Sequence, residues 1–211
     1  MVLFKRLIEI FCFFALIEIC IWYIGPRHPL LREMCIVNLA IAMMMSSIGH
    51  EDTPEALGFK PTKNGAWHIV ALGVMLNLSM LAMLCMAYNK TGIGSFEDFA
   101  LRALFYLPWA LAQQFAANSF FTNRLYAVFG KGRERATSVL SGALFAVVHL
   151  PNPVLFLFAF INGALGARIF LSHKNLCALV VAHAILAPAV ELFLPESWHK
   201  GLAIGPGFLM K

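Results

Sequence analysis

Two histidines and a group of side-chain amides are the residues of this chain best suited to chemistry. His149 lies in FAVVHLPN and His183 in VVAHAILAP, each within a long apolar stretch. Gln113, Gln114 and Asn118 lie in another apolar stretch, where the four-residue spacing of Gln114 and Asn118 places both on one helix face. Imidazole can bind a metal, transfer a proton or donate a hydrogen bond. Because polar groups at bilayer depth are costly, these residues are candidates for one convergent site.

A purely structural explanation of the same residues stays open. Amides and histidines within the membrane also form interhelical hydrogen bonds, which contribute roughly 0.6 to 2 kcal/mol each. The remaining histidines lie in predicted loops or near the ends of apolar stretches, where we expect interfacial positions without a catalytic role: His28, His50, His68, His173 and His199.

The composition indicates an integral membrane protein. Of 211 residues, 60% are hydrophobic and 13% charged, and the mean hydropathy is +0.76. Soluble domains are nearer half apolar and a quarter charged. The net charge of +5 does not indicate nucleic-acid binding, because the basic residues are scattered between apolar stretches. We predict a single integral membrane domain over residues 1–211. Its five cysteines form no CxxC pair and are predicted to be free thiols.

About seven stretches are long enough, or nearly so, to cross a bilayer as helices, which takes roughly 20 apolar residues. The sequence therefore predicts an all-α, polytopic transmembrane bundle. A polar stretch covers residues 49–65, and a glycine-rich loop covers 89–95. Small residues four apart, as at Gly142 and Ala146, predict close helix packing. The predicted spans are 7–25, 34–48, 66–88, 99–121, 136–150, 153–171 and 176–194.

The distribution of Lys and Arg predicts a cytoplasmic N-terminus, since cytoplasmic loops carry the excess of these residues. Ten of the 16 fall on the N-terminal side of the predicted bundle and six on the other. A prokaryotic plasma membrane is the default location. The ten are Lys5, Arg6, Lys60, Lys63, Arg124, Lys131, Arg133, Arg135, Arg168 and Lys174; the six are Arg27, Arg32, Lys90, Arg102, Lys200 and Lys211.

Residues 99–188 resemble the CAAX-protease and bacteriocin-processing (CPBP/ABI) family of intramembrane metalloproteases. Phe145-Ala-Val-Val-His149, followed by Leu-Pro-Asn, matches the family's Phe-x-x-x-His motif, and His183 matches the histidine of its last motif. The resemblance implies an endopeptidase in which a glutamate activates water and the histidines support attack on a peptide carbonyl.

Four positions depart from the family pattern. Gln113 and Gln114 stand where the family has paired glutamates, Asn118 where it has an arginine, and Ala187 where it has an asparagine. An amide has no proton-accepting state near neutral pH, so these glutamines cannot serve as general bases, although they can still orient a substrate by hydrogen bonding. Whether the chain is an enzyme is therefore left open, with the family resemblance favouring one.

The resemblance also implies a metal, zinc or another divalent ion, at His149 and His183. A catalytic zinc normally has three protein ligands and a water, so a third ligand is needed. Glu18, within the first apolar stretch, and a glutamine carbonyl are the candidates.

Three functions fit these residues. The first is an intramembrane endopeptidase of the CAAX-processing type, cleaving a membrane-anchored peptide or protein, with His149, His183, Gln113, Gln114 and Asn118 as catalytic-site residues. The second is an inactive relative that binds a peptide or lipid as a scaffold, chaperone or immunity factor. The third is a small transporter or proton relay. All three imply contact with membrane lipid, and none implies nucleic acid.

Overall fold

The computed structural model describes residues 2–62, 64–88 and 95–211, and this part of the chain contains helices and no strands. Five helical segments are long and apolar enough to cross a membrane. These are α1 (Val2–Ile19) with the π-helix η1 (Cys20–Ile24), α2 (Pro29–Gly49), α3 (Ala66–Ala87), α7 (Pro153–His173) and α8 (Leu176–Phe193). The predicted all-α membrane bundle is confirmed.

Two further helices complete the approximate count of seven. α4 (Phe96–Gln114) continues without a break into the π-helix η2 (Phe115–Thr122) and α5 (Asn123–Phe129), but its first two turns carry three charges. α6 (Glu134–Val147) has 14 residues, hence a length of about 21 Å against a hydrocarbon core of about 30 Å. α2 is longer than the predicted span, since Pro29 suits the first turn of a helix.

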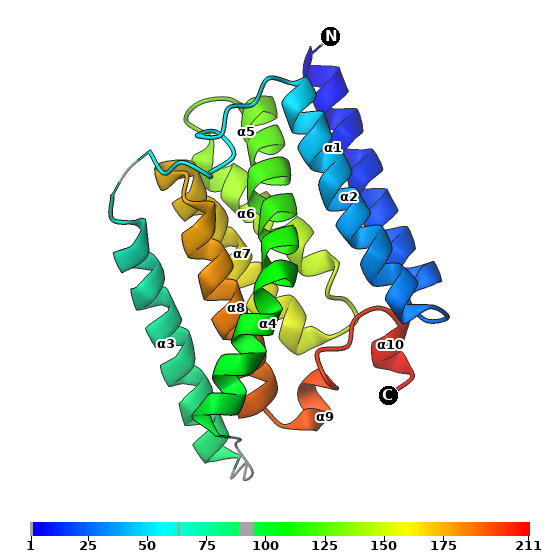
Figure 1. Ribbon diagram of the computed structural model, residues 1–211, viewed down its shortest axis with the longest axis vertical. Coiled ribbons are helices and arrows are strands. Elements are labelled where there is room, and N and C mark those ends of the chain that lie inside the picture. The colour runs from blue at the N-terminus through cyan, green and yellow to red at the C-terminus, as the bar shows by residue number, and fades with distance from the viewer. Residues whose placement is uncertain (1, 63, 89–94) are drawn as a thin grey trace.

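Helix α4 lies at the front of the bundle, with α1 and α2 on one side, α3 on the other and α6 and α7 behind (Figure 1). The end at which α1 begins is called here the N-terminal end, and the short helices α9 (Glu196–His199) and α10 (Pro206–Leu209) lie at the opposite end. The loop residues 89–94, together with Lys63 and Lys90 from the charge count, lie outside the described residues.

Glycine brings α6 and α7 into backbone contact, as the small-residue spacing predicted. A Cβ placed on Gly142 would lie 2.6 Å from the backbone nitrogen of Ala164, and one on Gly163 would lie 3.2 Å from the Gly142 Cα. A side chain at position 142 would collide with the α7 backbone, and one at position 163 would be in tight contact with α6. This close pair places the end of α6, and therefore His149, at a defined position beside α7.

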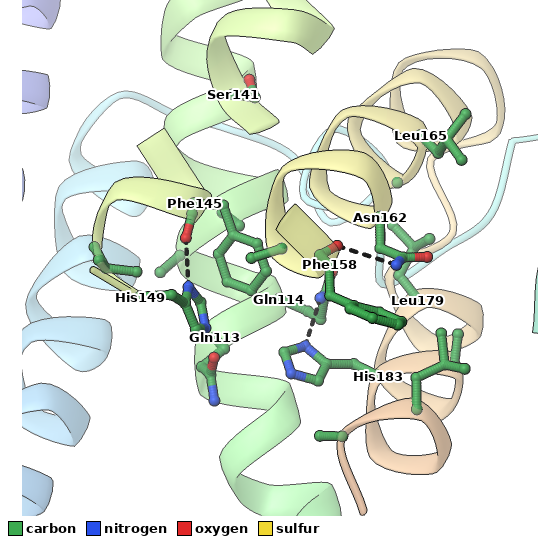
Figure 2. Close-up of a pocket in the computed structure, with 18 of the residues that line it drawn as sticks. Gln113, Gln114, Ser141, Phe145, His149, Phe158, Asn162, Leu165, Leu179 and His183 are labelled. Carbon is green, nitrogen blue, oxygen red and sulfur yellow. Dashed lines mark hydrogen bonds between the residues drawn. The ribbon is translucent and has the colours of Figure 1, made fainter. Parts of the chain in front are cut away.

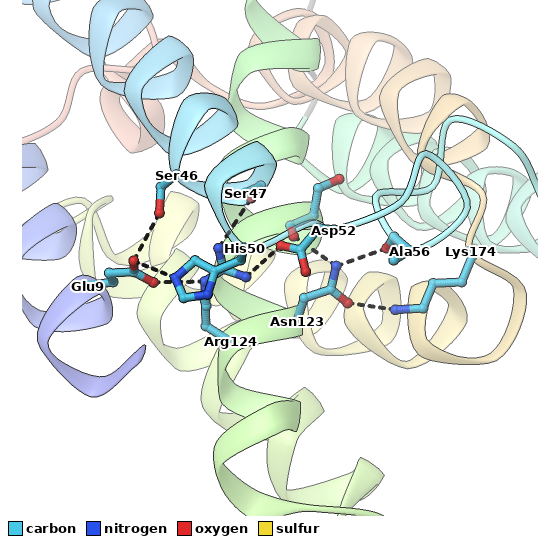
Figure 3. A network of polar contacts seen from close by, with 10 residues as sticks. Glu9, Ser46, Ser47, His50, Asp52, Ala56, Asn123, Arg124 and Lys174 are labelled. Atoms are coloured by element: carbon cyan, nitrogen blue, oxygen red, sulfur yellow. Dashed lines mark hydrogen bonds and ion pairs between the residues drawn. The ribbon is translucent and has the colours of Figure 1, made fainter. Parts of the chain in front are cut away.

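A buried ion-pair network attaches α1 and α2 to the rest of the bundle (Figure 3). Arg124 was counted as a loop cation, but its side chain is only 1% exposed. Its Nε donates to Glu9 Oε2 at 3.0 Å and its Nη1 to Asp52 Oδ2 at 2.7 Å. The other Glu9 oxygen lies 2.7 Å from His50 Nε2 and accepts a hydrogen bond from Ser46. Charges buried in this way are retained only when they are paired and hydrogen-bonded.

The segment between α2 and α3 packs across the N-terminal end of the bundle. The Ser119 hydroxyl donates to the Leu57 carbonyl at 2.6 Å, and the Asn123 amide donates to the Ala56 carbonyl at 2.9 Å. Gly58 has a φ of +83°, and a Cβ there would lie 2.6 Å from the Phe170 ring. The segment predicted to be a polar interruption is therefore held to the helices by its backbone.

The turn that follows His149 is held by the C-terminal segment. Asn152 is fully buried, and its amide donates to the carbonyls of His199 and Ala203, each at 3.1 Å. The Gly205 backbone N–H donates to the Leu150 carbonyl at 2.8 Å. Satisfied hydrogen bonds of this kind leave the turn little freedom to move. No disulfide joins the five cysteines, all of which lie among the described residues.

Candidate functional site

A largely apolar cavity of about 670 Å³ lies behind α4. Side chains from α1, α2, α3, α4, α6, α7 and α8 line it, and most of them are aliphatic or aromatic. Figure 2 shows its polar residues gathered near one another, with Gln113, Gln114, His149 and His183 among those that line it. A deep apolar cavity with a few convergent polar groups is the usual form of a ligand site.

The polar residues of α4 lie where the helix changes its winding. Gln114 ends α4, and η2 begins at the next residue. Short π-helical stretches are frequent at functional sites. The buried Asn118 amide donates to Gln114 Oε1 at 2.7 Å, which turns the amide nitrogen of Gln114 toward α8. Gln113 points elsewhere and donates to the hydroxyl of Tyr106 at 3.3 Å.

The ring of His183 is oriented by Gln114. The distance from Gln114 Nε2 to His183 Nδ1 is 2.7 Å. An amide NH2 group can only donate, so Nδ1 is the acceptor and carries no proton in this arrangement. In the neutral ring, the proton then resides on Nε2. Asn118, Gln114 and His183 thus form a directed chain of hydrogen bonds from η2 to α8.

The ring of His149 has the opposite tautomer. Its Nδ1 lies 2.7 Å from the carbonyl oxygen of Phe145, one helical turn earlier. A carbonyl can only accept, so Nδ1 carries the proton and Nε2 keeps a lone pair. The Phe145 ring packs edge-on against both imidazoles, with centroid distances of 5.0 Å to His149 and 5.8 Å to His183. The cavity therefore receives a proton acceptor from one histidine and a proton donor from the other.

No Asp or Glu among the described residues lines this cavity. Within the described part of the chain, no group of three His, Cys, Asp or Glu residues is placed to hold a metal. Glu18, the proposed third ligand, instead accepts a hydrogen bond from the Trp22 indole on its own helix at 3.0 Å. Two imidazoles, one with its proton on Nε2, do not fit the three-ligand catalytic zinc site. Zinc stays a prediction from sequence that these donors do not support.

Part of the chain matches a known protein family. Residues 96–187 match the family described as Type II CAAX prenyl endopeptidase Rce1-like. This match confirms the resemblance that the motifs predicted. No curated protein and no solved structure matches the chain. The Rce1-like segment begins at the first residue of α4 and ends within α8, so α1, α2, α3 and the C-terminal segment lie outside it.

The five residues predicted as the catalytic site lie within the Rce1-like segment, and the structure brings them together, whereas Glu18, the candidate third ligand, lies outside both the segment and the cavity. Gln113, Gln114, His149 and His183 line one cavity, and Asn118 lies behind Gln114. The catalytic role of each remains a prediction. Reasoning from sequence missed Tyr106, which binds Gln113, since a tyrosine two turns earlier on an apolar helix gave no signal.

A second pair of amides was also not predicted from the sequence. Asn77 of α3 and Asn162 of α7 line the same cavity and donate reciprocally to each other's side-chain oxygen, at 3.2 and 3.3 Å. Two asparagines in separate apolar stretches are a signal that could have indicated such a bridge, because each needs a partner in the membrane.

Proposed function

We propose that this protein is an intramembrane endopeptidase of the CAAX-processing type, which hydrolyses a peptide bond of a membrane-anchored substrate. The family match supports the reaction class, and the apolar cavity suits a substrate that carries a lipid anchor. The observation that carries the proposal is the opposite tautomers of His149 and His183, since peptide hydrolysis needs both a proton acceptor and a donor.

In the proposed reaction, Nε2 of His149 removes a proton from a water molecule as its oxygen attacks the scissile carbonyl carbon. The Nε2–H of His183 donates a hydrogen bond to the carbonyl oxygen as negative charge develops there. The His149 imidazolium then gives its proton to the leaving amine, and the C–N bond breaks. A neutral imidazole acting as a hydrogen-bond donor is an established device for polarising a carbonyl.

The amides act as positioning residues in this scheme. Gln114, held by Asn118, keeps the proton of His183 on Nε2, where the developing oxyanion needs it. Gln113 and Tyr106 lie on the same cavity wall and offer hydrogen bonds to the substrate backbone. In this scheme, the glutamine at position 114 has a role of its own, because it orients His183 in a different way from the glutamate of the family pattern.

The proposed setting is a prokaryotic plasma membrane with the N-terminus in the cytoplasm. The excess of Lys and Arg at the N-terminal end of the bundle supports this orientation. The partners are membrane lipid and a lipid-anchored peptide or protein.

A second function is favoured by one observation. No carboxylate among the described residues lines the cavity, and glutamate is the base that the family resemblance implies. A relative without this base would retain the cavity and bind a membrane-anchored peptide or lipid as a scaffold, chaperone or immunity factor.

Mass spectrometry of membrane-protein termini separates the two functions. Cells lacking the protein are compared with cells expressing wild type, His149→Ala, or His68→Ala, which changes an exposed histidine outside the cavity. The endopeptidase predicts a new terminus with wild type and His68→Ala that is absent with His149→Ala. Identical termini in all four strains, with normal membrane insertion, contradict the endopeptidase and favour the scaffold.

A further inference from the structure

The cavity extends beyond the histidine pair into a groove between α3 and α7. Figure 2 shows Asn162 and Leu165 of α7 on the far side of the cavity from His149. The hydrogen-bonded pair Asn77 and Asn162 lines the cavity at the inner end of this groove. We call it the α3–α7 groove and define its walls by Ile69, Leu72, Gly73, Leu76, Leu165 and Ile169.

The depth of the α3–α7 groove corresponds to one leaflet of a bilayer. From Asn162 to the last residue of α7, His173, the helix rises about 16 Å, while half of the hydrocarbon core measures about 15 Å. A Cβ placed on Gly73 would have no atom within 4 Å, so the groove is open beside this residue. Leu72 and Leu165 are more than half exposed, and both line the groove.

A cation lies at the outer end of the groove. Arg168 lines the cavity one helical turn before the end of α7, together with Ser172 and His173. Its side chain is exposed and forms no ion pair within 4 Å among the residues that the structure describes. Its charge acts weakly on Glu134, whose pKa is lowered first by its own backbone N–H, then by Tyr126 and Gly132, and last by Arg168.

Two other cations at this end of the bundle, Lys174 and Arg124, have partners of their own. Lys174 donates to Asn123 Oδ1 at 2.6 Å and lies 4.4 Å from the Phe170 ring centroid. Arg124 is buried in its ion-pair network. Arg168 lines the cavity and has no ion pair among the described residues, so its guanidinium is available at the mouth of the groove. A guanidinium binds phosphate oxygens through two parallel N–H donors.

We infer that the α3–α7 groove binds one acyl chain of an anionic phospholipid, whose phosphate rests on Arg168, from the leaflet at the N-terminal end of the bundle. The walls of the groove are apolar, as is the acyl chain, and the groove is about as deep as one leaflet. The positive charge of Arg168 is opposite to that of the headgroup phosphate. Basic pockets between transmembrane helices recognise anionic headgroups in this way. The groove continues the cavity that His149 and His183 line, but its residues differ from the histidine pair and its lipid binding does not require proteolysis.

Native mass spectrometry of the full-length protein in detergent tests the inference. The protein is titrated with phosphatidylglycerol or with phosphatidylcholine of the same chains. We expect wild type to bind phosphatidylglycerol about fivefold more tightly than phosphatidylcholine. A factor of this size is the usual effect of one basic residue near the headgroups. Arg168→Gln abolishes this preference, Arg168→Lys retains most of it, and Gly73→Leu weakens binding of both lipids by filling the groove.

The matched control is Arg135→Gln, which removes an exposed arginine at the same end of the bundle that does not line the cavity. Thermal unfolding of each variant establishes that it is folded. Equal affinity of wild type for the two lipids overturns the inference. So does an Arg168→Gln variant that behaves like Arg135→Gln, or a folded Gly73→Leu variant that binds both lipids as wild type does.

Discussion

The amide nitrogen of Gln114 lies 2.7 Å from Nδ1 of His183, whereas Nδ1 of His149 lies 2.7 Å from the backbone carbonyl of Phe145. One imidazole accepts at Nδ1 and the other donates there, so their Nε2 atoms present opposite functions to the same cavity. A glutamate in place of Gln114 would accept where the amide donates. The residue at position 114 therefore determines the tautomer of His183.

Gln114→Glu should convert the pair into a better metal site. The carboxylate would accept the Nδ1 proton of His183 and free the lone pair on Nε2, as in carboxylate–histidine–zinc arrangements. We expect zinc affinity, measured by calorimetric titration in detergent, to rise about 10- to 100-fold. The control is Gln113→Glu, because Gln113 contacts Tyr106 and not the imidazole. Unchanged zinc binding in Gln114→Glu would show that position 114 does not determine the tautomer.

Arg124→Met should strongly destabilise the bundle. It leaves Glu9 and Asp52 with no cation between them in a partly buried site, which costs about 3 to 5 kcal/mol. Chemical unfolding in detergent measures the loss, and the exposed Arg135→Met should change stability by less than about 0.5 kcal/mol. Adding Glu9→Gln and Asp52→Asn to Arg124→Met should recover part of the loss. A variant as stable as wild type would contradict a stabilising role for the network.

The Asn77–Asn162 bridge should show a measurable coupling. A double-mutant cycle with Asn77→Ala and Asn162→Ala should give an interaction energy of about 0.6 to 1.7 kcal/mol, from the average to the maximum measured for hydrogen bonds within membranes. Asn77→Ala with Asn38→Ala is the control pair, since the hydrogen bond of Asn38 among the described residues stays within α2, to the Met34 carbonyl. Additive effects of Asn77→Ala and Asn162→Ala would mean that the bridge does not stabilise the fold.

Lys174 should make stability depend on alkaline pH. Burial lowers the pKa of Lys174 to about 8, against the opposing effect of the Asp52 charge. Between pH 8 and about 10.5 the unfolded chain holds a proton that the folded protein has lost, so stability rises with pH across this window. From pH 8 to about 10.5, the free energy of unfolding of wild type should rise, relative to that of Lys174→Met, by an amount on the order of 3 kcal/mol. A constant difference between the two proteins from pH 7 to 10.5 would contradict the lowered pKa.

Local features of the sequence were enough to predict the helices and the gathering of the site residues. Apolar length indicates a span, and the spacing of Gln114 and Asn118 puts both on one face wherever the helix lies. The pairing of Glu9 with Arg124 joins residues 115 positions apart, and no local pattern encodes it. The direction of the hydrogen bonds from Asn118 through Gln114 to His183 could not be predicted either. It depends on the orientation of the two side-chain amides.

The most direct test of the proposed mechanism compares glutamine substitutions at the two histidines, using purified protein and a lipid-anchored peptide. Glutamine has an N–H donor but no basic nitrogen. His183→Gln should therefore retain more cleavage than His183→Ala, which loses about 10²- to 10³-fold. His149→Gln should be as inactive as His149→Ala, each losing about 10²- to 10⁴-fold, while His68→Gln stays at the wild-type rate. Equal effects of glutamine at positions 149 and 183, or full cleavage without either imidazole, would contradict the division of roles.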